Sequence, residues 1–345
     1  MPGPLTDAYA WAVVALFALG AAVEYRGRTG GRSDASVLGG LGSGADLPTL
    51  ARSVTAVAWV AFAGFWLVLT PHFVFTQKSF VEGALSLAAV PACLYAAALL
   101  WQGRDTLFVL SRAVAVMGAV YLPFETIPAV TLLGVELPAP KRVLIRTVTE
   151  QTLFVMGQVG FRPELVAGDL GYLNTYQAYA EDGQRLLFSI VLACTGLGSM
   201  AIFAGLIGAV RAPLGRKLRA LAVSIPLIWV LNLARTTFIG VVFLDQRMQF
   251  FVDPIVRYVG VADAYKVSFF LSDRVISQVL AVVALVGITY LVVRQLPELL
   301  RVIEDVLYML TKEEYDLAEE LDLPREPTEA PEPLGGSGSA DRTAD

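Results

Sequence analysis

Apolar stretches about as long as a lipid bilayer is thick recur along this chain, and they constrain its fold more than any other feature. A membrane-spanning helix needs roughly 20 mostly apolar residues. Seven stretches approach or meet this requirement, over residues 7–25, 54–76, 81–101, 106–133, 186–210, 218–244 and 268–293. Only 17% of the chain is charged, against about 25% in soluble domains. The sequence therefore predicts an all-α, polytopic helical membrane protein with about seven transmembrane helices. The fourth has the weakest boundary, because Pro123 interrupts it.

Basic residues in short connections predict the orientation of the chain, since such residues collect on the cytoplasmic side. They occur after the first helix (Arg26 to Arg52), at Arg104, between Arg211 and Arg219, and from Arg294 to Arg301. With seven spans all four regions fall on one side. We therefore expect a plasma-membrane protein with its N-terminus outside and its C-terminus in the cytoplasm.

The same pattern divides the chain into functional parts. We expect residues 1–300 to form a transmembrane catalytic domain, with the site helices within 186–293. Residues 134–185 are too polar to span the membrane and too apolar to be a fully solvated loop, so they are expected to form an extracytoplasmic interfacial loop. Residues 30–48 are a Gly/Ser-rich linker, and residues 301–345 an acidic, largely disordered cytoplasmic tail.

Two arginines inside predicted spans indicate a functional site, because a guanidinium within a bilayer is costly. Arg235 lies in "NLARTTFIG" and Arg274 in "FFLSDRVISQ". Cys194 lies in "SIVLACTGLG", on the helix that precedes them. At about 1.5 Å per residue, all three are expected about 9–14 Å below the outer interface. Three consecutive antiparallel helices thus place one thiol and two guanidiniums at one depth.

The chemistry that suits this constellation is nucleophilic attack by a thiolate. Neighbouring cations lower the pKa of a cysteine, and guanidiniums can also stabilise the oxyanion that forms on an attacked carbonyl. Asn232 and Gln278 share a helix face with Arg235 and Arg274 respectively, so each is expected to orient a guanidinium or bind substrate backbone. Asp273 is adjacent to Arg274 in the sequence and is therefore expected to point away from it, either as an ion-pair partner for another charge or as a proton acceptor. No general base is assigned.

Other candidate residues have plainer interpretations. The remaining cysteine, Cys93, is expected to be a small buried hydrophobe, and the single histidine, His72, an interfacial residue at a helix end. With one histidine and two separated cysteines, neither a metal site nor a cofactor is predicted. The small residues after Cys194 are expected to allow close helix packing: Gly196, Gly198, Ser199, Ala201 and Gly205.

At these residues the chain resembles the exosortase/archaeosortase family of polytopic membrane cysteine transpeptidases. The resemblance rests on alanine-cysteine-threonine-glycine at 193–196, asparagine-x-x-arginine at 232–235, and a third polar site on the next helix. It is closest to the archaeosortase A branch, because "SDRVISQ" supplies Arg274 where most of the family has a histidine. The resemblance implies Cys194 as nucleophile, with Arg235 and Arg274 as activating and charge-stabilising partners.

The resemblance also implies a substrate and a reaction. The substrates are surface proteins, such as surface-layer glycoprotein, with a C-terminal signal made of a short PGF-type motif, a transmembrane helix and a basic tail. Cleavage through a thioester transfers the new C-terminus to a membrane lipid. Two alternatives remain open: an intramembrane-type cysteine protease without transfer, and a transporter or lipid-binding protein that uses Arg235 and Arg274 for an anionic solute. Neither nucleic acid nor a cofactor is expected as a partner.

Overall fold

The computed structural model describes residues 3–29, 47–76, 80–132, 134–259, 263–313 and 315–320. Almost all of the predicted linker, and the acidic tail beyond residue 320, lie outside the described residues. Six of the described helical rods are long and apolar enough to cross a membrane, which confirms a helical polytopic membrane protein.

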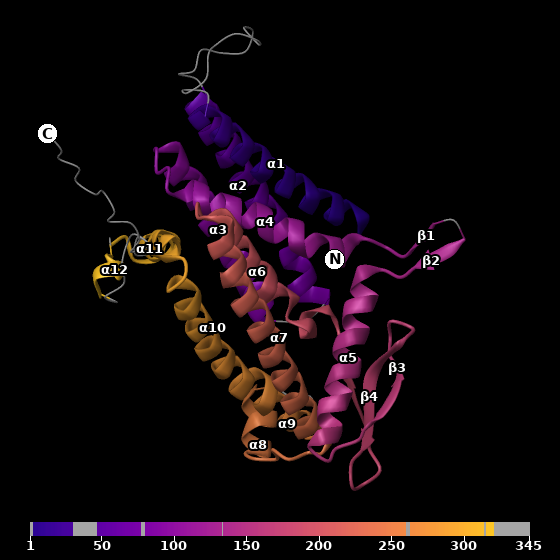
Figure 1. The fold of residues 1–345 in the computed structure, drawn as a ribbon. Helices are drawn as coiled ribbons and strands as arrows, with labels where there is room; N and C mark the ends of the chain where they lie inside the picture. Colours follow the sequence, from indigo (N-terminus) through magenta and orange to yellow (C-terminus); the bar gives the residue numbers. More distant parts are fainter. Residues whose placement is uncertain are drawn as a thin grey trace, which may run out of the picture.

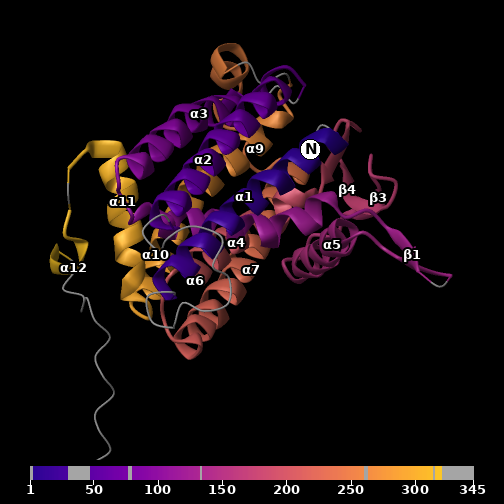
Figure 2. The ribbon, with the colours of Figure 1, turned by 90° about the horizontal axis from the view of Figure 1, so that it is seen from above.

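Four of these rods are N-terminal: α1 (Pro4–Thr29), α2 (Leu47–Pro71) with a π-helical end η1 (His72–Thr76), α3 (Phe80–Trp101) and α4 (Leu107–Thr126). The fifth is α7 (Leu214–Leu244). The sixth is continuous through α9 (Lys266–Phe269), the π-helical segment η4 (Phe270–Ser277) and α10 (Gln278–Val293). In Figures 1 and 2, α1 to α4 form one group; α6 packs against α4, and α7 contacts both α6 and α10. The short α8 (Val252–Pro254) and η3 (Ile255–Val259) precede α9, while η5 (Pro297–Leu299), α11 (Leu300–Thr311) and α12 (Leu317–Glu320) follow α10.

The helix predicted over 186–210 is the main difference from expectation. Its first part is strand β5 (Arg185–Ser189), followed by a 3₁₀ turn η2 (Leu192–Thr195) and only then by the helix α6 (Leu197–Ala209). Hydropathy alone cannot separate a buried apolar strand from half of a helix. The fourth helix also ends earlier than predicted, at Thr126, after which strands β1 (Val130–Leu132) and β2 (Val135–Leu137) begin.

The predicted loop 134–185 is folded into a small α/β unit. Helix α5 (Pro140–Gln158) packs against α7, and β3 (Glu164–Ala167), β4 (Leu173–Tyr179) and β5 form an antiparallel sheet with β4 in the centre. Register places Tyr176 opposite Phe188, and the two rings stack with centroids 6.1 Å apart. Figure 1 shows this unit at the end of the molecule opposite α11.

Two apolar cores hold the bundle together. One lies among α1 to α4 around Phe17, Trp59 and Leu107. The other joins α5 and the sheet to α6, α7, α10 and α11, and Cys194 packs against it. A Cβ added at Gly205 would lie 2.6 Å from the carbonyl oxygen of Ala113, so this glycine lets α6 approach α4 closely, as predicted. Gly198 has no such role, because nothing lies within 4 Å of an added Cβ there.

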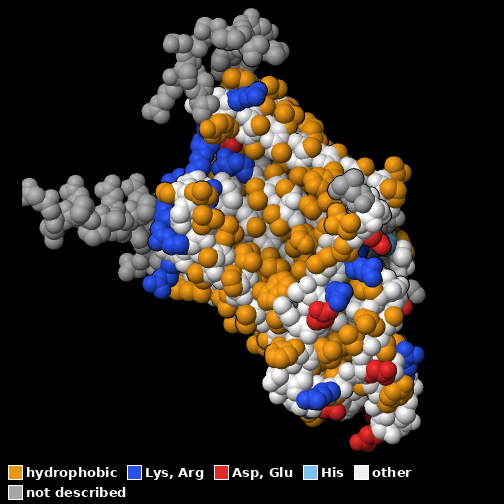
Figure 3. All heavy atoms as spheres, turned by 45° about the vertical axis from the view of Figure 1, so that its right-hand side comes forward, with side chains coloured by type: hydrophobic (Ala, Val, Ile, Leu, Met, Phe, Trp, Pro, Cys, Tyr) orange, Lys and Arg blue, Asp and Glu red, His pale blue; other side chains and the backbone are white. Residues whose placement is uncertain are grey.

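All four arginine-bearing regions meet at one end of the molecule. Ion pairs join Arg52 to Asp105, Arg104 to Asp305 and Arg216 to Glu298, linking the connections to one another. Figure 3 shows lysine and arginine side chains gathered at this end, beside a broad apolar surface. The shared end agrees with the predicted arrangement of the connections; its assignment to the cytoplasm stays a prediction.

Candidate active site

Cys194 lies in a tight turn between a strand and a helix. Strand β5 leads into η2, and Gly196 then adopts a left-handed conformation with φ of +75°. A non-glycine residue is strained there. Within the turn the Thr195 hydroxyl donates to the Leu192 carbonyl at 2.7 Å. The sequence "CTG" therefore folds locally into a turn that presents the thiol at the start of α6.

Helix α7 holds this turn from the side. The Asn232 side-chain amide donates to the carbonyl oxygen of Cys194 at 2.9 Å, and the Thr236 hydroxyl lies 3.4 Å from the same oxygen. A Cβ added at Gly196 would lie only 3.0 Å from Cγ of Asn232. The turn and α7 are thus in direct contact at the nucleophile candidate. We expected Asn232 to orient a guanidinium or to bind substrate; its amide instead fixes the Cys194 backbone.

Asp273 lies between the two candidate arginines. Its carboxylate accepts from Nη2 of Arg235 at 2.7 Å and lies 3.6 Å from Nε of Arg274. The first contact confirms Asp273 as an ion-pair partner for a charge on another helix. Asp273 and Arg274 both belong to the π-helical segment η4, and such wide turns occur often at functional sites.

Arg235 keeps hydrogen-bonding capacity beyond its ion pair. Its Nε atom is buried and has no hydrogen-bond partner among the described residues, although a guanidinium carries five N–H donors. A buried donor without a partner is costly, so this atom can still donate a hydrogen bond to a further group.

The electrostatic environment of the thiol differs from expectation. Cys194 lies outside the six candidate spans, and burial raises the pKa of its thiol above the ordinary value; Arg235 acts to lower this pKa and Asp273 to raise it. The expectation was two cations without a nearby anion. In the structure the effect of the Arg235 guanidinium on the thiol is counteracted by the carboxylate of Asp273, its ion-pair partner.

The two remaining candidates are less enclosed. The side chain of Arg274 is 51% exposed, and the side chain of Gln278 is exposed with no hydrogen-bond partner within the described part of the chain. The contacts form two groups, Cys194 with Asn232 and Arg235 with Asp273, and Arg274 contacts Asp273 in the second group. Gln278 belongs to neither group.

Two further residues belong to the site that sequence reasoning missed. Thr236 also donates to the Asn232 carbonyl at 2.8 Å and so completes the support of the turn. Tyr176 of β4 is fully buried, donates to the Thr149 carbonyl at 2.6 Å, and is close enough to Cys194 for a thiolate there to raise its pKa. Burial is the main reason that the pKa of Tyr176 is raised, which keeps this phenol neutral. No sequence signal connected Tyr176 with the cysteine, since the strand pairing brings them together.

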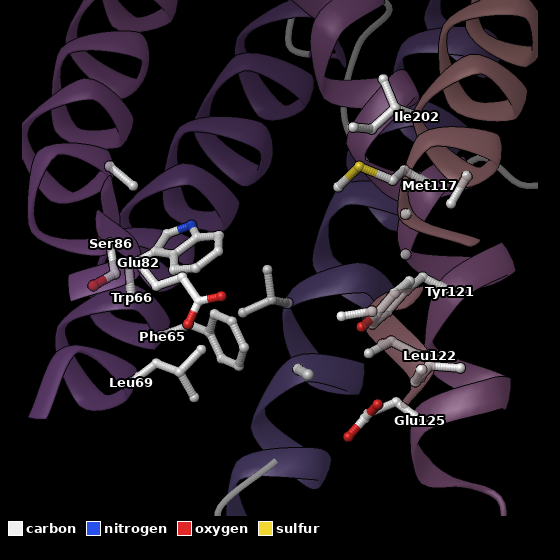
Figure 4. Close-up of a pocket in the computed structure, with 18 of the residues that line it drawn as sticks. Phe65, Trp66, Leu69, Glu82, Ser86, Met117, Tyr121, Leu122, Glu125 and Ile202 are labelled. Atoms are coloured by element: carbon white, nitrogen blue, oxygen red, sulfur yellow. The ribbon is translucent and has the colours of Figure 1, made fainter. Parts of the chain in front are cut away.

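A cavity of about 880 Å³ adjoins the other side of the Cys194 turn. Residues 191–193 and three residues of α6 form one wall, and the remaining walls come chiefly from α1 to α4. Figure 4 shows Glu82 of α3 and Glu125 of α4 facing the cavity from opposite sides, with Met117 and Ile202 farther along it. His72 also lines the cavity. It is therefore an amphipathic cavity, apolar along most of its length and carrying two carboxylates.

Lys141 of α5 lines the cavity as well and pairs with Glu125 at 3.7 Å. The cavity charge therefore comes from two carboxylates and one ammonium. Among the described residues no cluster of histidine, cysteine and carboxylate side chains suits a metal ion.

Comparison with known proteins agrees with these features. The family model described as transmembrane exosortase matches residues 44–271. Archaeosortase A of Haloferax volcanii is 56% identical over 323 residues, covering 94% of this chain and 100% of the relative. Archaeosortase A of Natronomonas pharaonis is 40% identical over 319 residues, covering 88% of this chain and 89% of the relative. No solved structure matches significantly. With the fold, the family match and these two relatives in agreement, the chain belongs to the exosortase/archaeosortase family.

Proposed function

We propose that this chain is a membrane cysteine transpeptidase that sorts surface proteins, with Cys194 as its nucleophile. The observation that carries the proposal is the Cys194 turn, which α7 fixes through Asn232 and which lies beside a guanidinium with a buried, unpaired Nε. Two archaeosortase A relatives that cover nearly the whole chain support the same activity. The substrates are surface proteins such as surface-layer glycoprotein, with a PGF-type motif, a transmembrane helix and a basic tail.

The first half of the reaction forms an acyl-enzyme. The Cys194 sulfur attacks the scissile carbonyl carbon, a C–S bond forms, and the peptide C–N bond breaks. The thiol proton ends on the released amine of the signal helix. Arg235 stabilises the oxyanion of the tetrahedral intermediate through its free N–H donors, and Arg274 adds its charge from the exposed side. Asp273 holds Arg235 in position.

The second half transfers the new C-terminus to a membrane lipid. A headgroup amine or hydroxyl attacks the thioester carbonyl, an amide or ester bond forms, the C–S bond breaks, and the proton of the headgroup passes to the released sulfur. The amphipathic cavity behind the Cys194 turn supports this step, because hydrocarbon chains can enter it while the headgroup stays near residues 191–193. The cavity of about 880 Å³ is lined mostly by apolar side chains, which suits lipid chains.

The proposed location follows from the same geometry. The chain lies in the plasma membrane, with the catalytic domain over residues 1–300, the extracytoplasmic unit over 134–185 and the cytoplasmic tail over 301–345. The site lies toward the outer leaflet, because it borders α5 and the sheet. A substrate helix enters beside α7 and α10, on the side where Arg274 and Gln278 are exposed.

The two alternatives receive less support. An anion transporter needs cationic charge that the protein leaves unneutralised, whereas Asp273 pairs with Arg235 and also contacts Arg274. A protease without transfer uses the same nucleophile but gives no role to the cavity. Mass spectrometry of the processed C-terminus separates transfer from hydrolysis, since only transfer leaves a lipid adduct.

Processing of a tripartite-signal substrate in cells tests the nucleophile. Cys194→Ala is expected to abolish processing, and Cys194→Ser to reduce it by several orders of magnitude. Cys93→Ala removes a thiol that is buried in the other core and is the matched control. Wild-type processing by Cys194→Ala would refute the mechanism.

Arg235→Lys tests whether the guanidinium itself is needed. Lysine keeps the charge but loses the fork of donors, so we expect a severe loss of turnover without loss of expression. Normal turnover would mean that charge alone suffices and that the proposed oxyanion contact is wrong.

A further inference from the structure

A second pocket, of about 300 Å³, lies at the arginine-bearing end of the molecule, and none of the candidate catalytic residues lines it. Four guanidiniums line it, from Arg28 of α1, Arg112 of α4, Arg211 after α6 and Arg301 of α11. We call it the guanidinium pocket. Phe108, Val109 and Val210 add apolar wall. Its members come from four separate segments, so the folded bundle rather than one basic stretch builds it.

One carboxylate serves three of these arginines. Glu24 is almost fully buried, with 4% of its side chain exposed, and accepts from Arg112 at 2.7 Å, Arg28 at 2.9 Å and Arg211 at 3.1 Å. Burial and the neighbouring charges of Arg28 and Arg112 lower the pKa of Arg211, while Glu24 only partly offsets them. Placing several guanidinium charges close together costs free energy unless an anion binds between them.

The other two carboxylates that line the pocket are committed elsewhere. Asp105 receives two hydrogen bonds from Arg52, both at 2.7 Å. Glu298 receives two from Arg216, at 2.6 and 3.4 Å. Neither Arg52 nor Arg216 lines the pocket, so these carboxylates are already neutralised by arginines outside it.

The charges therefore leave the pocket short of an anion. Arg301 pairs with no carboxylate among the described residues, and Arg28 and Arg211 both pair with Glu24, which Arg112 also contacts. Each guanidinium has five N–H donors in a planar fork, which matches the oxygens of a phosphate group. Arg28 and Arg211 are also about half exposed, at 51% and 52%.

We propose that the guanidinium pocket is a phosphate-binding site. Its ligand is a phosphate group, carried either by an anionic membrane lipid whose chains run along the apolar wall or by soluble phosphate. On the predicted orientation the site faces the cytoplasmic leaflet. It lies at the opposite end of the bundle from the cysteine, so it binds its ligand independently of the proposed reaction.

Native mass spectrometry of the full-length protein in detergent tests this site. The probes are a phosphatidylglycerol lipid, a lipid with the same chains and an uncharged hydroxyl headgroup, and inorganic phosphate as competitor. Arg301→Gln removes one pocket guanidinium that makes no ion pair with any described residue, so the fold is retained. Arg219→Gln makes the same charge change on α7, at the same end of the molecule, and the Arg219 guanidinium donates to the carbonyl of Gly215 outside the pocket.

We expect the wild type and Arg219→Gln to hold one phosphatidylglycerol with equal affinity, and Arg301→Gln to bind it about tenfold more weakly. The hydroxyl lipid should not bind specifically. Displacement of the lipid by millimolar inorganic phosphate would assign soluble phosphate as the ligand, and resistance to it would assign the lipid. Equal binding by Arg301→Gln and wild type, or equal weakening by Arg219→Gln, would overturn the proposal.

Discussion

Replacement of Gly196 by alanine should disable the nucleophile without touching its sulfur. The residue has φ of +75°, and an alanine in this left-handed conformation costs about 1–2 kcal/mol. The added Cβ would lie 3.0 Å from Cγ and 3.1 Å from Cβ of Asn232, which is too close for two carbon atoms. Asn232 must then move, and its hydrogen bond to the Cys194 carbonyl, now 2.9 Å long, is strained or lost.

A net hydrogen bond contributes about 1 kcal/mol, so the competent turn should lose about 2–3 kcal/mol in total. Each 1.4 kcal/mol is about tenfold in population, and the processing rate of a tripartite-signal substrate should fall roughly 30- to 150-fold. Gly198→Ala is the matched control, because nothing lies within 4 Å of its added Cβ. The assay is the rate of substrate cleavage at equal amounts of folded enzyme. A wild-type rate for Gly196→Ala, or an equal loss in Gly198→Ala, would refute the role assigned to the turn.

Three further predictions follow from the other features. Ala89→Phe fills part of the amphipathic cavity, so it should shift the products from lipid adduct to free acid. Ala98→Phe, on the exposed face of the same helix, should leave the products unchanged. Mass spectrometry of the products checks both results. Glu24→Gln leaves three arginines without their shared carboxylate, so the free energy of unfolding should fall by about 3–5 kcal/mol. Thermal unfolding in detergent should then occur at a lower temperature, and an unchanged unfolding temperature would contradict this. Asp273→Asn removes the charge that raises the pKa of Cys194, so the thiol should alkylate at lower pH, and an unchanged pH midpoint would exclude that electrostatic effect.

The sequence was sufficient for the features that follow from helical periodicity and charge. Hydropathy predicted a helical polytopic membrane protein, and the arginine-bearing connections share one end as the charge pattern predicted; six of the described helices, where about seven were predicted, are long and apolar enough to span a membrane. The prediction that Arg235 acts near Cys194 assumed a helix over 186–210, whereas Cys194 lies in a 3₁₀ turn after β5. An ion pair was one of two roles predicted for Asp273, and Asp273 pairs with Arg235.

What the sequence could not supply depended on long-range pairing and on exact dihedral angles. The residues of β5 are predicted as helix because a short apolar run has no periodicity that distinguishes a strand from a helix. They form a strand because they pair with β4. Tyr176 reaches Cys194 only through that pairing. The π-helical register of η4 directs Asp273 to Arg235 and leaves Gln278 exposed, and spacing rules for a regular helix did not foresee it. Asn232 was expected to orient a guanidinium or to bind substrate backbone, whereas its amide donates to the backbone carbonyl of Cys194, a partner that spacing along a helix does not indicate.

The turn that carries Cys194 also separates two environments. On its N-terminal side the backbone belongs to a hydrogen-bonded sheet, and on its C-terminal side it enters an apolar helix beside the amphipathic cavity. A thioester formed there would face water from one direction and amphiphiles from the other. The ratio of hydrolysis to transfer would then depend on how fully the amphipathic cavity is occupied when the acyl-enzyme forms. An enzyme of this design can favour transfer by filling its own cavity before it cuts.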